Sequence, residues 1–196
     1  MNDENKEENK KEKAGEKQTI RQRLLSWLGF LAVAAAMLFF FAPESWWQFG
    51  VSPMSERRSS VNFSLPEING GVWNFGEQRG RVVVINYWAT WCPPCRVETP
   101  GLVNVANDYK SRGVEMVGVT MDENLSDVPP FIEKYQIKYP ILLPDTDPNI
   151  GAATALPTTL LFDKNGRLAK KYTGIVLEST LKSDIEILLA ETTDTY

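Results

Sequence analysis

The chain contains no histidine and only two cysteines among its 196 residues. Without histidine there can be no Ser-His-Asp or Cys-His catalytic site, no haem held by histidine and no zinc site with a histidine ligand. Two cysteines are too few for a four-cysteine zinc site within one chain. A Gly-x-Gly-x-x-Gly motif for a dinucleotide is also lacking. The two cysteines are therefore the first candidates for chemistry, and we expect no metal and no organic cofactor.

The sequence also lacks an excess of basic residues. It has 21 Lys and Arg against 25 Asp and Glu, for a net charge of -4, which argues against a nucleic-acid-binding surface. Hydrophobic residues make up 43% and charged residues 23%, a balance typical of a globular protein. The length suffices for a membrane anchor and one domain of ordinary size, but not for two domains with cores of their own.

The N-terminal region changes abruptly in composition. Residues 1–23 carry seven Lys or Arg and six Asp or Glu, which predicts a disordered, solvated tail. Residues 24–42 carry no charge, and at about 1.5 Å per residue they just span a bilayer core of roughly 30 Å as a helix. We therefore predict a single transmembrane helix, with Trp46 and Trp47 in the interface that follows it.

The charges on either side of this segment predict its orientation. Seven Lys or Arg precede it and two follow it within twenty residues, which places the tail in the cytoplasm and the domain outside. A cleavable signal peptide is the alternative, but residues 39–41 are all Phe where small residues would be needed, which favours an uncleaved signal-anchor. Residues 43–60 are predicted to be a flexible linker, with a reach of roughly 23 Å.

Residues 61–196 are predicted to form one α/β domain. The Asn-Gly-Gly sequence at 69–71 lies between apolar stretches and predicts an N-terminal β-hairpin. Continuous apolar, β-branched runs at 82–88 and 114–120 predict buried strands, and the apolar spacing over 177–188 predicts an amphipathic final helix. The order of elements indicates a central mixed sheet with helices on both faces. Further predicted elements are a short helix at 131–135, a helix or turn at 150–155, and strands at 139–143, 159–163 and 168–172.

Both cysteines, Cys92 and Cys95, follow the first buried strand and begin a helix. One helical turn brings their Cα atoms into the range of a disulfide. Cys92 lies at the helix N-terminus, where free N–H groups and the helix dipole favour the thiolate, so we predict that Cys92 attacks and Cys95 resolves. A purely structural disulfide is the alternative, but it would constrain little chain and stabilise little. Haem attachment is excluded because Arg96 replaces the required histidine.

The sequence Trp-Ala-Thr-Trp-Cys-Pro-Pro-Cys at residues 88–95 closely resembles the active site of the thioredoxin superfamily. The surrounding pattern resembles the membrane-anchored TlpA/ResA-like thiol-disulfide oxidoreductases, which carry a redoxin-type domain. This pattern includes Phe-x-Leu-Pro at 63–66, Leu-Pro-Thr-Thr at 156–159 and the turn at 163–166. The resemblance covers about residues 61–190 and implies a thioredoxin-like fold.

The resemblance also implies roles for residues outside the cysteine pair. Pro157 matches the family's cis-proline, and the backbone of Leu156 would bind a substrate peptide together with Trp91 and Pro93. A trans proline opening a strand is the alternative for Pro157. In the family, a glutamate at the position of Glu98 is linked to the active-site thiols and could accept a proton from Cys95.

Two questions about the carboxylate remain open at this point. Glu98 could instead be a first-turn glutamate that complements the helix dipole. Asn86 occupies the position where cytosolic thioredoxins carry a buried aspartate, and an amide cannot shuttle protons at neutral pH. If a carboxylate assists the thiols, it must therefore be Glu98.

These features predict an enzyme that reduces disulfides. Pro93 and Pro94 remove two backbone donors that could stabilise the Cys92 thiolate, which favours the disulfide form and a low potential. The resemblance suggests apocytochrome c or copper-site assembly proteins as substrates, a membrane thiol-electron donor as partner, and a location on the outer (periplasmic or extracytoplasmic) side of a bacterial cytoplasmic membrane. Two alternatives remain, namely a peroxiredoxin-like thiol peroxidase and a non-catalytic peptide-binding module.

Overall fold

The computed structural model describes residues 27–30, 33, 50–57, 61–144 and 155–192. The chain divides into two units, residues 1–49 and residues 50–196. The predicted tail at 1–23, most of the predicted transmembrane helix at 24–42 and nearly all of the predicted helix or turn at 150–155 lie outside the described residues. Residues 27–30 are helical. Within the described ranges, no helix combines the length and the hydropathy that crossing a bilayer requires.

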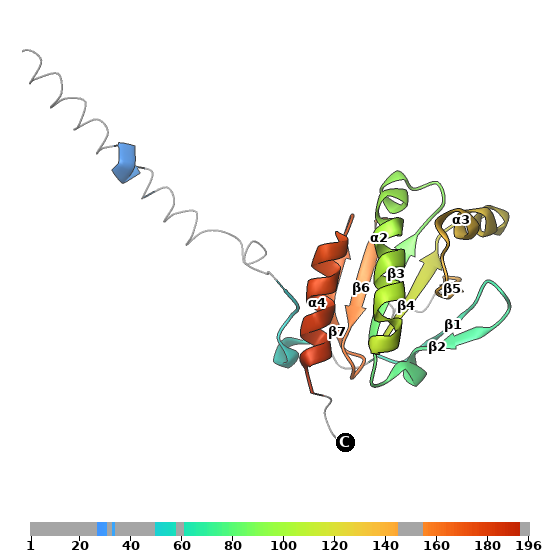
Figure 1. Cartoon of the computed structure of the whole chain (residues 1–196), viewed down its shortest axis with the longest axis horizontal. Coiled ribbons are helices and arrows are strands. Elements are labelled where there is room, and N and C mark those ends of the chain that lie inside the picture. Colours follow the sequence, from blue (N-terminus) through green and yellow to red (C-terminus); the bar gives the residue numbers. More distant parts are fainter. Residues whose placement is uncertain (1–26, 31–32, 34–49, 58–60, 145–154, 193–196) are drawn as a thin grey trace, which may run out of the picture. The chain divides into compact units, whose positions relative to one another are not determined.

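A five-stranded mixed sheet forms the centre of the second unit (Figure 1). Its order is β5-β4-β3-β6-β7, with β3, β4 and β5 parallel and with β6 antiparallel to both β3 and β7. All seven residues of β3 are buried, as the continuous apolar run predicted. The thioredoxin-like fold with a central mixed sheet is thus confirmed. The strands are β3 (Val82–Trp88), β4 (Val114–Thr120), β5 (Ile141–Leu142), β6 (Thr158–Phe162) and β7 (Leu168–Thr173).

The helices α2 (Pro93–Tyr109), α3 (Val128–Tyr135) and α4 (Glu178–Ala190) all cover one face of this sheet. In Figure 1, α2 and α4 lie side by side in front of the sheet, and their apolar residues share one buried cluster with Val82 and Val84. Phe131 of α3 stacks on Trp88, with ring centroids 4.5 Å apart, and Trp88 points to the same face as Val84.

The expectation of helices on both faces is therefore not met within the described residues. The reason is topological. The crossovers from β3 to β4 and from β4 to β5 step in the same direction across the sheet, and both are right-handed by rule, so α2 and α3 lie on the same face.

Aromatic side chains before β3 cover the opposite face. Strands β1 (Ser64–Pro66) and β2 (Val72–Asn74) pair antiparallel, with Leu65 opposite Trp73. The turn between them needs Gly70, whose φ of 91° lies in the left-handed region. Phe63 stacks on Phe75 with centroids 4.7 Å apart. Phe75 begins the short helix η3 (Phe75–Gln78) and meets Phe162 of β6 edge-on, which joins this layer to the sheet.

A segment within the predicted linker is packed onto the domain. The short helix η2 (Met54–Glu56) leads to Arg57, whose side chain is 1% exposed. The guanidinium of Arg57 donates to Asp163 at 2.9 Å and to both carboxylate oxygens of Glu191 at 2.7 Å. Residues 50–57 thus belong to the domain, which departs from the prediction of a flexible linker over 43–60. The mixed composition of the segment gives no sign of these long-range ion pairs.

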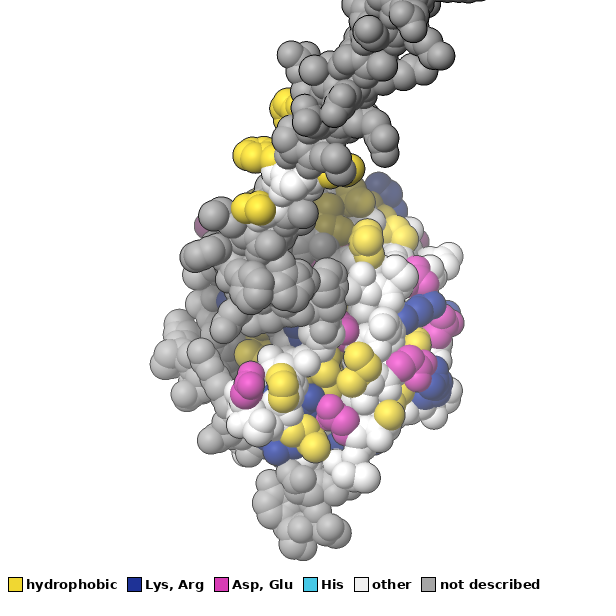
Figure 2. Space-filling model, turned by 90° about the vertical axis from the view of Figure 1, so that its left-hand side faces the viewer, with side chains coloured by type: hydrophobic (Ala, Val, Ile, Leu, Met, Phe, Trp, Pro, Cys, Tyr) yellow, Lys and Arg dark blue, Asp and Glu magenta, His cyan; other side chains and the backbone are white. Residues whose placement is uncertain are grey.

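Acidic and basic side chains lie next to one another on the face of the molecule seen in Figure 2. Between α2 and α4, Arg112 pairs with Glu186 at 2.6 Å and Lys182 pairs with Asp108 at 2.8 Å. Lys182 also pairs with Glu178 one turn away. At these pairs, opposite charges offset one another, so they do not form a patch of a single sign that would attract a polyanion.

Candidate active site

Cys92 and Cys95 form a disulfide at the N-terminus of α2, with their Cα atoms 5.3 Å apart. Cys92 is the N-cap residue, and the backbone N–H of Cys95 donates to its Sγ at 3.3 Å. Cys92 is 3% exposed and Cys95 is fully buried. Cys92 is thus nearly enclosed in this disulfide form, because it belongs to an apolar cluster with Ala89 and Val128.

The turn before Cys92 is held by a carboxylate from the neighbouring strand. The backbone N–H of Thr90 donates to Asp122 at 2.9 Å, and its Oγ1 donates to the same carboxylate at 2.6 Å. Arg96 donates its Nε to the Thr90 carbonyl at 2.7 Å. The sequence analysis missed Asp122. The available signal was an acidic residue directly after a buried strand, since the carboxyl ends of parallel strands meet at one edge of a sheet.

Glu98 is 5% exposed, and both of its carboxylate oxygens accept hydrogen bonds. Nδ2 of Asn86 donates to Oε1 at 2.8 Å, and the backbone N–H of Val176 donates to Oε2 at 3.1 Å. Asn86 also donates to Oγ1 of Thr159 at 2.9 Å. Burial raises the pKa of Glu98 above its ordinary value, and the two hydrogen bonds oppose this rise without cancelling it.

The position of Glu98 shows whether it is a first-turn glutamate that complements the dipole of α2. The first turn of α2 contains no acidic residue, and Glu98 lies one turn beyond Cys95 with its carboxylate turned into the protein. The alternative of a first-turn glutamate that complements the helix dipole is therefore wrong. What remains is a buried carboxylate one turn along α2 from Cys95, held in place by residues from β3 and from the loop before α4.

The remaining predicted site residues differ in their exposure and in how they pack near the disulfide. Trp91 is 63% exposed and Pro93 is also exposed, so both present surface to a partner. Leu156 is half-buried and packs against the cluster that contains Cys92 and Cys95. The Leu156–Pro157 bond is cis, as the resemblance implied, and the alternative of a trans proline is wrong. The structure thus brings Leu156 and the cysteine pair together, whereas the binding of a peptide there stays a prediction.

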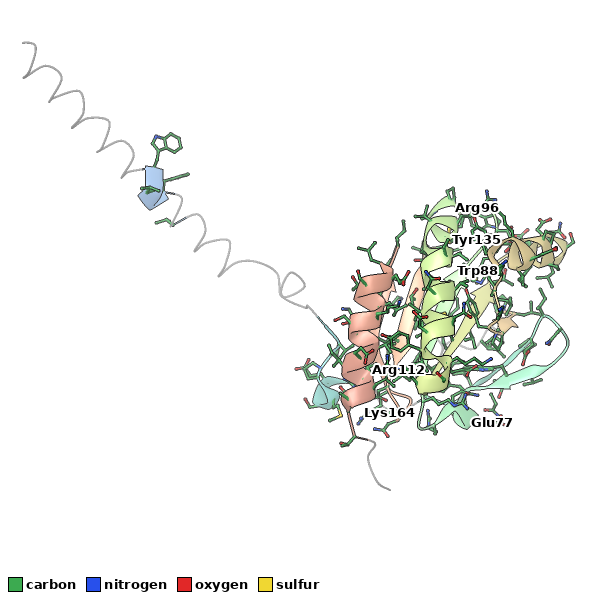
Figure 3. All side chains as sticks on the ribbon, in the orientation of Figure 1. Glu77, Trp88, Arg96, Arg112, Tyr135 and Lys164 are labelled. Atoms are coloured by element: carbon green, nitrogen blue, oxygen red, sulfur yellow. A yellow bond between two sulfur atoms is a disulfide. The ribbon has the colours of Figure 1, made fainter. Side chains whose placement is uncertain are left out.

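The site occupies one end of the molecule (Figure 3). Arg96, Trp88 and Tyr135 lie toward this end, and Arg112 and Lys164 lie toward the other. Lys164 donates to the carbonyl of Glu191, the residue that binds Arg57. Residues 50–57 of the domain are therefore packed far from the cysteine pair.

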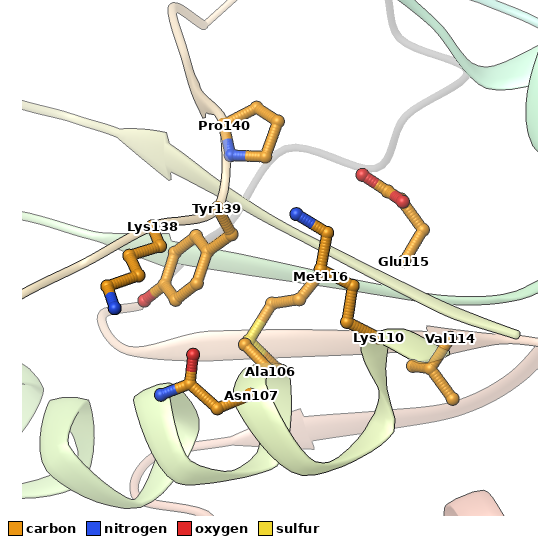
Figure 4. A pocket seen from close by; sticks show the side chains of 9 residues that line it. All are labelled: Ala106, Asn107, Lys110, Val114, Glu115, Met116, Lys138, Tyr139 and Pro140. Atoms are coloured by element: carbon orange, nitrogen blue, oxygen red, sulfur yellow. The ribbon is translucent and has the colours of Figure 1, made fainter. Parts of the chain in front are cut away.

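A cavity of about 110 Å³ lies elsewhere, against the C-terminal half of α2 (Figure 4). Its lining includes Ala106, Lys110, Met116 and Tyr139. Ala106 lies roughly 16 Å along the helix axis from Cys95, so this cavity is separate from the redox site. The described part of the chain holds no group of three or more His, Cys, Asp or Glu residues arranged to bind a metal ion.

Comparison with known proteins agrees with this geometry. The family model described as Redoxin matches residues 59–187. The chain is 34% identical over 142 residues to the thiol-disulfide oxidoreductase ResA of Bacillus subtilis, covering 71% of this chain and 79% of that protein. It is 32% identical over 173 residues to ResA of Halalkalibacterium halodurans, covering 85% of this chain and 94% of that protein.

Solved structures are similar over the same region. A putative thiol:disulfide interchange protein DsbE from Chlorobium tepidum superposes with a TM-score of 0.61 at 25% identity, covering 68% of this chain and 97% of that one. A DsbF homologue from Corynebacterium diphtheriae gives a TM-score of 0.64 at 25% identity, covering 70% of this chain and 91% of that one. The compared regions span most of each solved chain, so the similarity is one of whole domains.

Proposed function

Because the chain belongs to the redoxin family and is a ResA-like thiol-disulfide oxidoreductase of the thioredoxin superfamily, we propose that it reduces disulfides of exported proteins. The observation that carries the proposal is the Cys92–Cys95 disulfide at the N-terminus of α2, with Leu156 and a cis-proline beside it. In the reduced enzyme, the Cys92 thiolate attacks a substrate disulfide and forms a mixed disulfide. Cys95 then attacks Cys92, which releases the substrate as a dithiol and leaves the pair oxidised.

The second step needs a group that takes the proton of the Cys95 thiol. Glu98 fits this role because it is one turn along α2 and its pKa is raised by burial, which brings its basicity closer to that of the thiol. The hydrogen bonds from Asn86 and Val176 fix the orientation of the carboxylate. Proton transfer to Glu98, directly or through one water molecule, is the step that we assign to this residue.

The donors around Cys92 support the proposed direction of the reaction. Pro93 and Pro94 have no N–H group. Of the first three residues of α2, only Cys95 therefore donates a backbone hydrogen bond to Sγ of Cys92. A thiolate with few donors is poorly stabilised, which favours the disulfide form and makes the Cys-Pro-Pro-Cys dithiol a reductant.

The proposal extends to where the enzyme works and with which partners. The uncharged run at 24–42 and the basic residues before it support a single-pass signal-anchor in a bacterial cytoplasmic membrane, with the catalytic domain on the outer side. Apocytochrome c, or copper-site assembly proteins, are the proposed substrates. A membrane thiol-electron donor would reduce the pair again, with no cofactor besides the two cysteines.

The test is to trap the mixed disulfide in the full chain. In Cys95→Ser the hydroxyl cannot resolve the bond to Cys92, so covalent complexes with envelope proteins should persist. Non-reducing gels should show them as additional bands that vanish with reductant, and Cys92→Ser, the matched control, should show none. Trapped apocytochrome c would support the proposed substrate. If Cys95→Ser traps no more than Cys92→Ser, the non-catalytic peptide-binding module becomes the better interpretation.

A further inference from the structure

The carboxylate of Asp122 accepts hydrogen bonds from Thr90, in the turn that precedes Cys92 and helix α2. Asp122 follows β4 and is 8% exposed. Its Oδ1 accepts from Oγ1 of Thr90 at 2.6 Å and from the Thr90 N–H at 3.1 Å, while Oδ2 accepts from the same N–H at 2.9 Å and from Oγ1 of Thr120 at 2.7 Å. All these donors are neutral, and among the described residues no lysine or arginine bonds to Asp122.

This arrangement places a negative charge near the attacking sulfur. Cys92 is two residues beyond Thr90, and two residues span at most about 7 Å. The chain also folds back there, because the N–H of Cys92 donates to the Ala89 carbonyl at 3.2 Å. The Asp122 carboxylate therefore lies within roughly 10 Å of the Cys92 backbone. Nearby charged groups include Arg96 and Glu123, which are exposed to solvent, and Glu98, which is buried.

We propose that Asp122 is a positioning residue for Cys92: its carboxylate fixes the Thr90 turn, and its charge disfavours the Cys92 thiolate. When the thiolate is disfavoured, the reduced dithiol form becomes less stable relative to the disulfide form. The dithiol is then a stronger reductant. The inference concerns the exchange chemistry itself and holds for any protein substrate. It can fail while Cys95→Ser still traps partners, so its failure and that of the proposed function are distinguishable.

Variants of Asp122 and Thr90 can separate the effect of the Asp122 charge from the effect of its hydrogen bonds to the turn. In Asp122→Asn the amide oxygen can keep both bonds from Thr90, and the amide nitrogen can donate to the Thr120 hydroxyl, so the turn stays while the charge is lost. Asp122→Ala removes both the charge and the bonds. Thr90→Val removes the bond from Oγ1 but keeps the charge and the N–H bond. Glu123→Gln is the control, because it removes an adjacent charge that is exposed and screened by solvent.

The readouts are the pH dependence of Cys92 alkylation and the equilibrium constant with glutathione, measured near pH 7 and near pH 9, above the ordinary thiol pKa of about 8.5. A charge at roughly 10 Å shifts the thiolate equilibrium by roughly two- to fifteenfold, for a local dielectric constant between that of water and about 20. Asp122→Asn should therefore lower the pKa of Cys92 and move the equilibrium toward the dithiol by that factor near pH 9, where tenfold corresponds to about 30 mV. Glu123→Gln should leave both values unchanged.

The rate of attack on a disulfide, compared at equal thiolate fraction, tests the positioning. It should fall in Asp122→Ala and in Thr90→Val and be largely retained in Asp122→Asn. If Asp122→Ala does not fold, Thr90→Val still provides the comparison. An Asp122→Asn variant with an unchanged or raised Cys92 pKa would overturn the electrostatic part. Variants that lower only the melting temperature, with rates and equilibrium unchanged, would overturn the proposal as a whole.

Discussion

Replacing Glu98 by Gln should change the pH dependence of stability in a direction that the structure fixes. The carboxylate is buried, and its pKa in the folded protein is raised above the ordinary value of 4.5. The folded state therefore binds the proton more tightly than the unfolded state does. The corresponding contribution to stability is fully present below about pH 4.5 and is lost as the pH rises through the folded pKa.

The size of the effect follows from comparing two neutral groups. Below about pH 4.5, Glu98→Gln should be less stable than the wild type with protonated Glu98 by an amount that does not depend on pH, because the amide nitrogen cannot accept one of the two hydrogen bonds from Asn86 and Val176. Above that pH, the wild-type protein loses about 1.4 kcal/mol for each unit by which its folded pKa is raised, and Glu98→Gln loses nothing. The variant should therefore gain stability relative to the wild type as the pH rises to the folded pKa, and the difference between the two proteins should then stay constant.

Urea unfolding of both proteins between about pH 4 and pH 8 measures this difference directly, since contributions from other groups cancel. Glu178→Gln is a control for which we expect the opposite pH dependence. Glu178 is on the surface and bonds to Lys182, which lowers the pKa of Glu178. The stability of the wild type should therefore increase relative to that of Glu178→Gln as the pH rises. If Glu98→Gln instead loses relative stability with rising pH, the two hydrogen bonds outweigh burial. Glu98 would then be a poor proton acceptor for Cys95.

Three further predictions concern other parts of the chain. Arg57→Met should cost about 3 kcal/mol in urea unfolding, at the low end for a broken buried ion pair because Asp163 keeps other donors; a loss below about 1 kcal/mol would mean that residues 50–57 are not packed in solution. Gly118→Ala should destabilise by about 1–3 kcal/mol, because the new Cβ would lie 2.7 Å from Nε1 of buried Trp88; an unchanged melting temperature would contradict this packing. In the reduced protein, iodoacetamide should label Cys92 first, and faster labelling of the other cysteine would reverse their roles.

The elements predicted best from sequence were those defined by local pattern. The bounds of β3 and β4 agree with the apolar runs, because a strand buried on both faces has no polar alternation to interrupt it. The cysteine pair was predicted equally well, because two cysteines with Cys-x-x-Cys spacing at the start of a helix lie within the distance that a disulfide requires. By contrast, the face on which α3 packs depends on where β5 joins the sheet, and β5 has only two residues, so its own sequence carries little information.

Contacts between distant parts of the chain could not be predicted in this way. Glu98 was identified through a resemblance, but its partner Val176 is 78 residues away and donates through its backbone, which no side-chain pattern can indicate. The bond between Thr90 and Asp122 spans 32 residues, and that between Arg57 and Glu191 spans 134. Each closes a long loop, so its partners become apparent only once the sheet order is known.

The sheet order also explains why two carboxylates near one cysteine pair can differ in behaviour. β3 and β4 are parallel, with Trp88 paired to Thr120, so the residues just beyond both strands meet at the same edge. Asp122 approaches the Cys92 turn from that edge and is bonded by two hydroxyl groups and a backbone N–H. Glu98 reaches Asn86 from α2, beneath the pair, where burial dominates and raises its pKa. A carboxylate in the apolar interior is suited to accept a proton. The two proposed roles follow this difference in surroundings: Glu98 would take the proton of Cys95, and Asp122 would act on the electrostatics of Cys92.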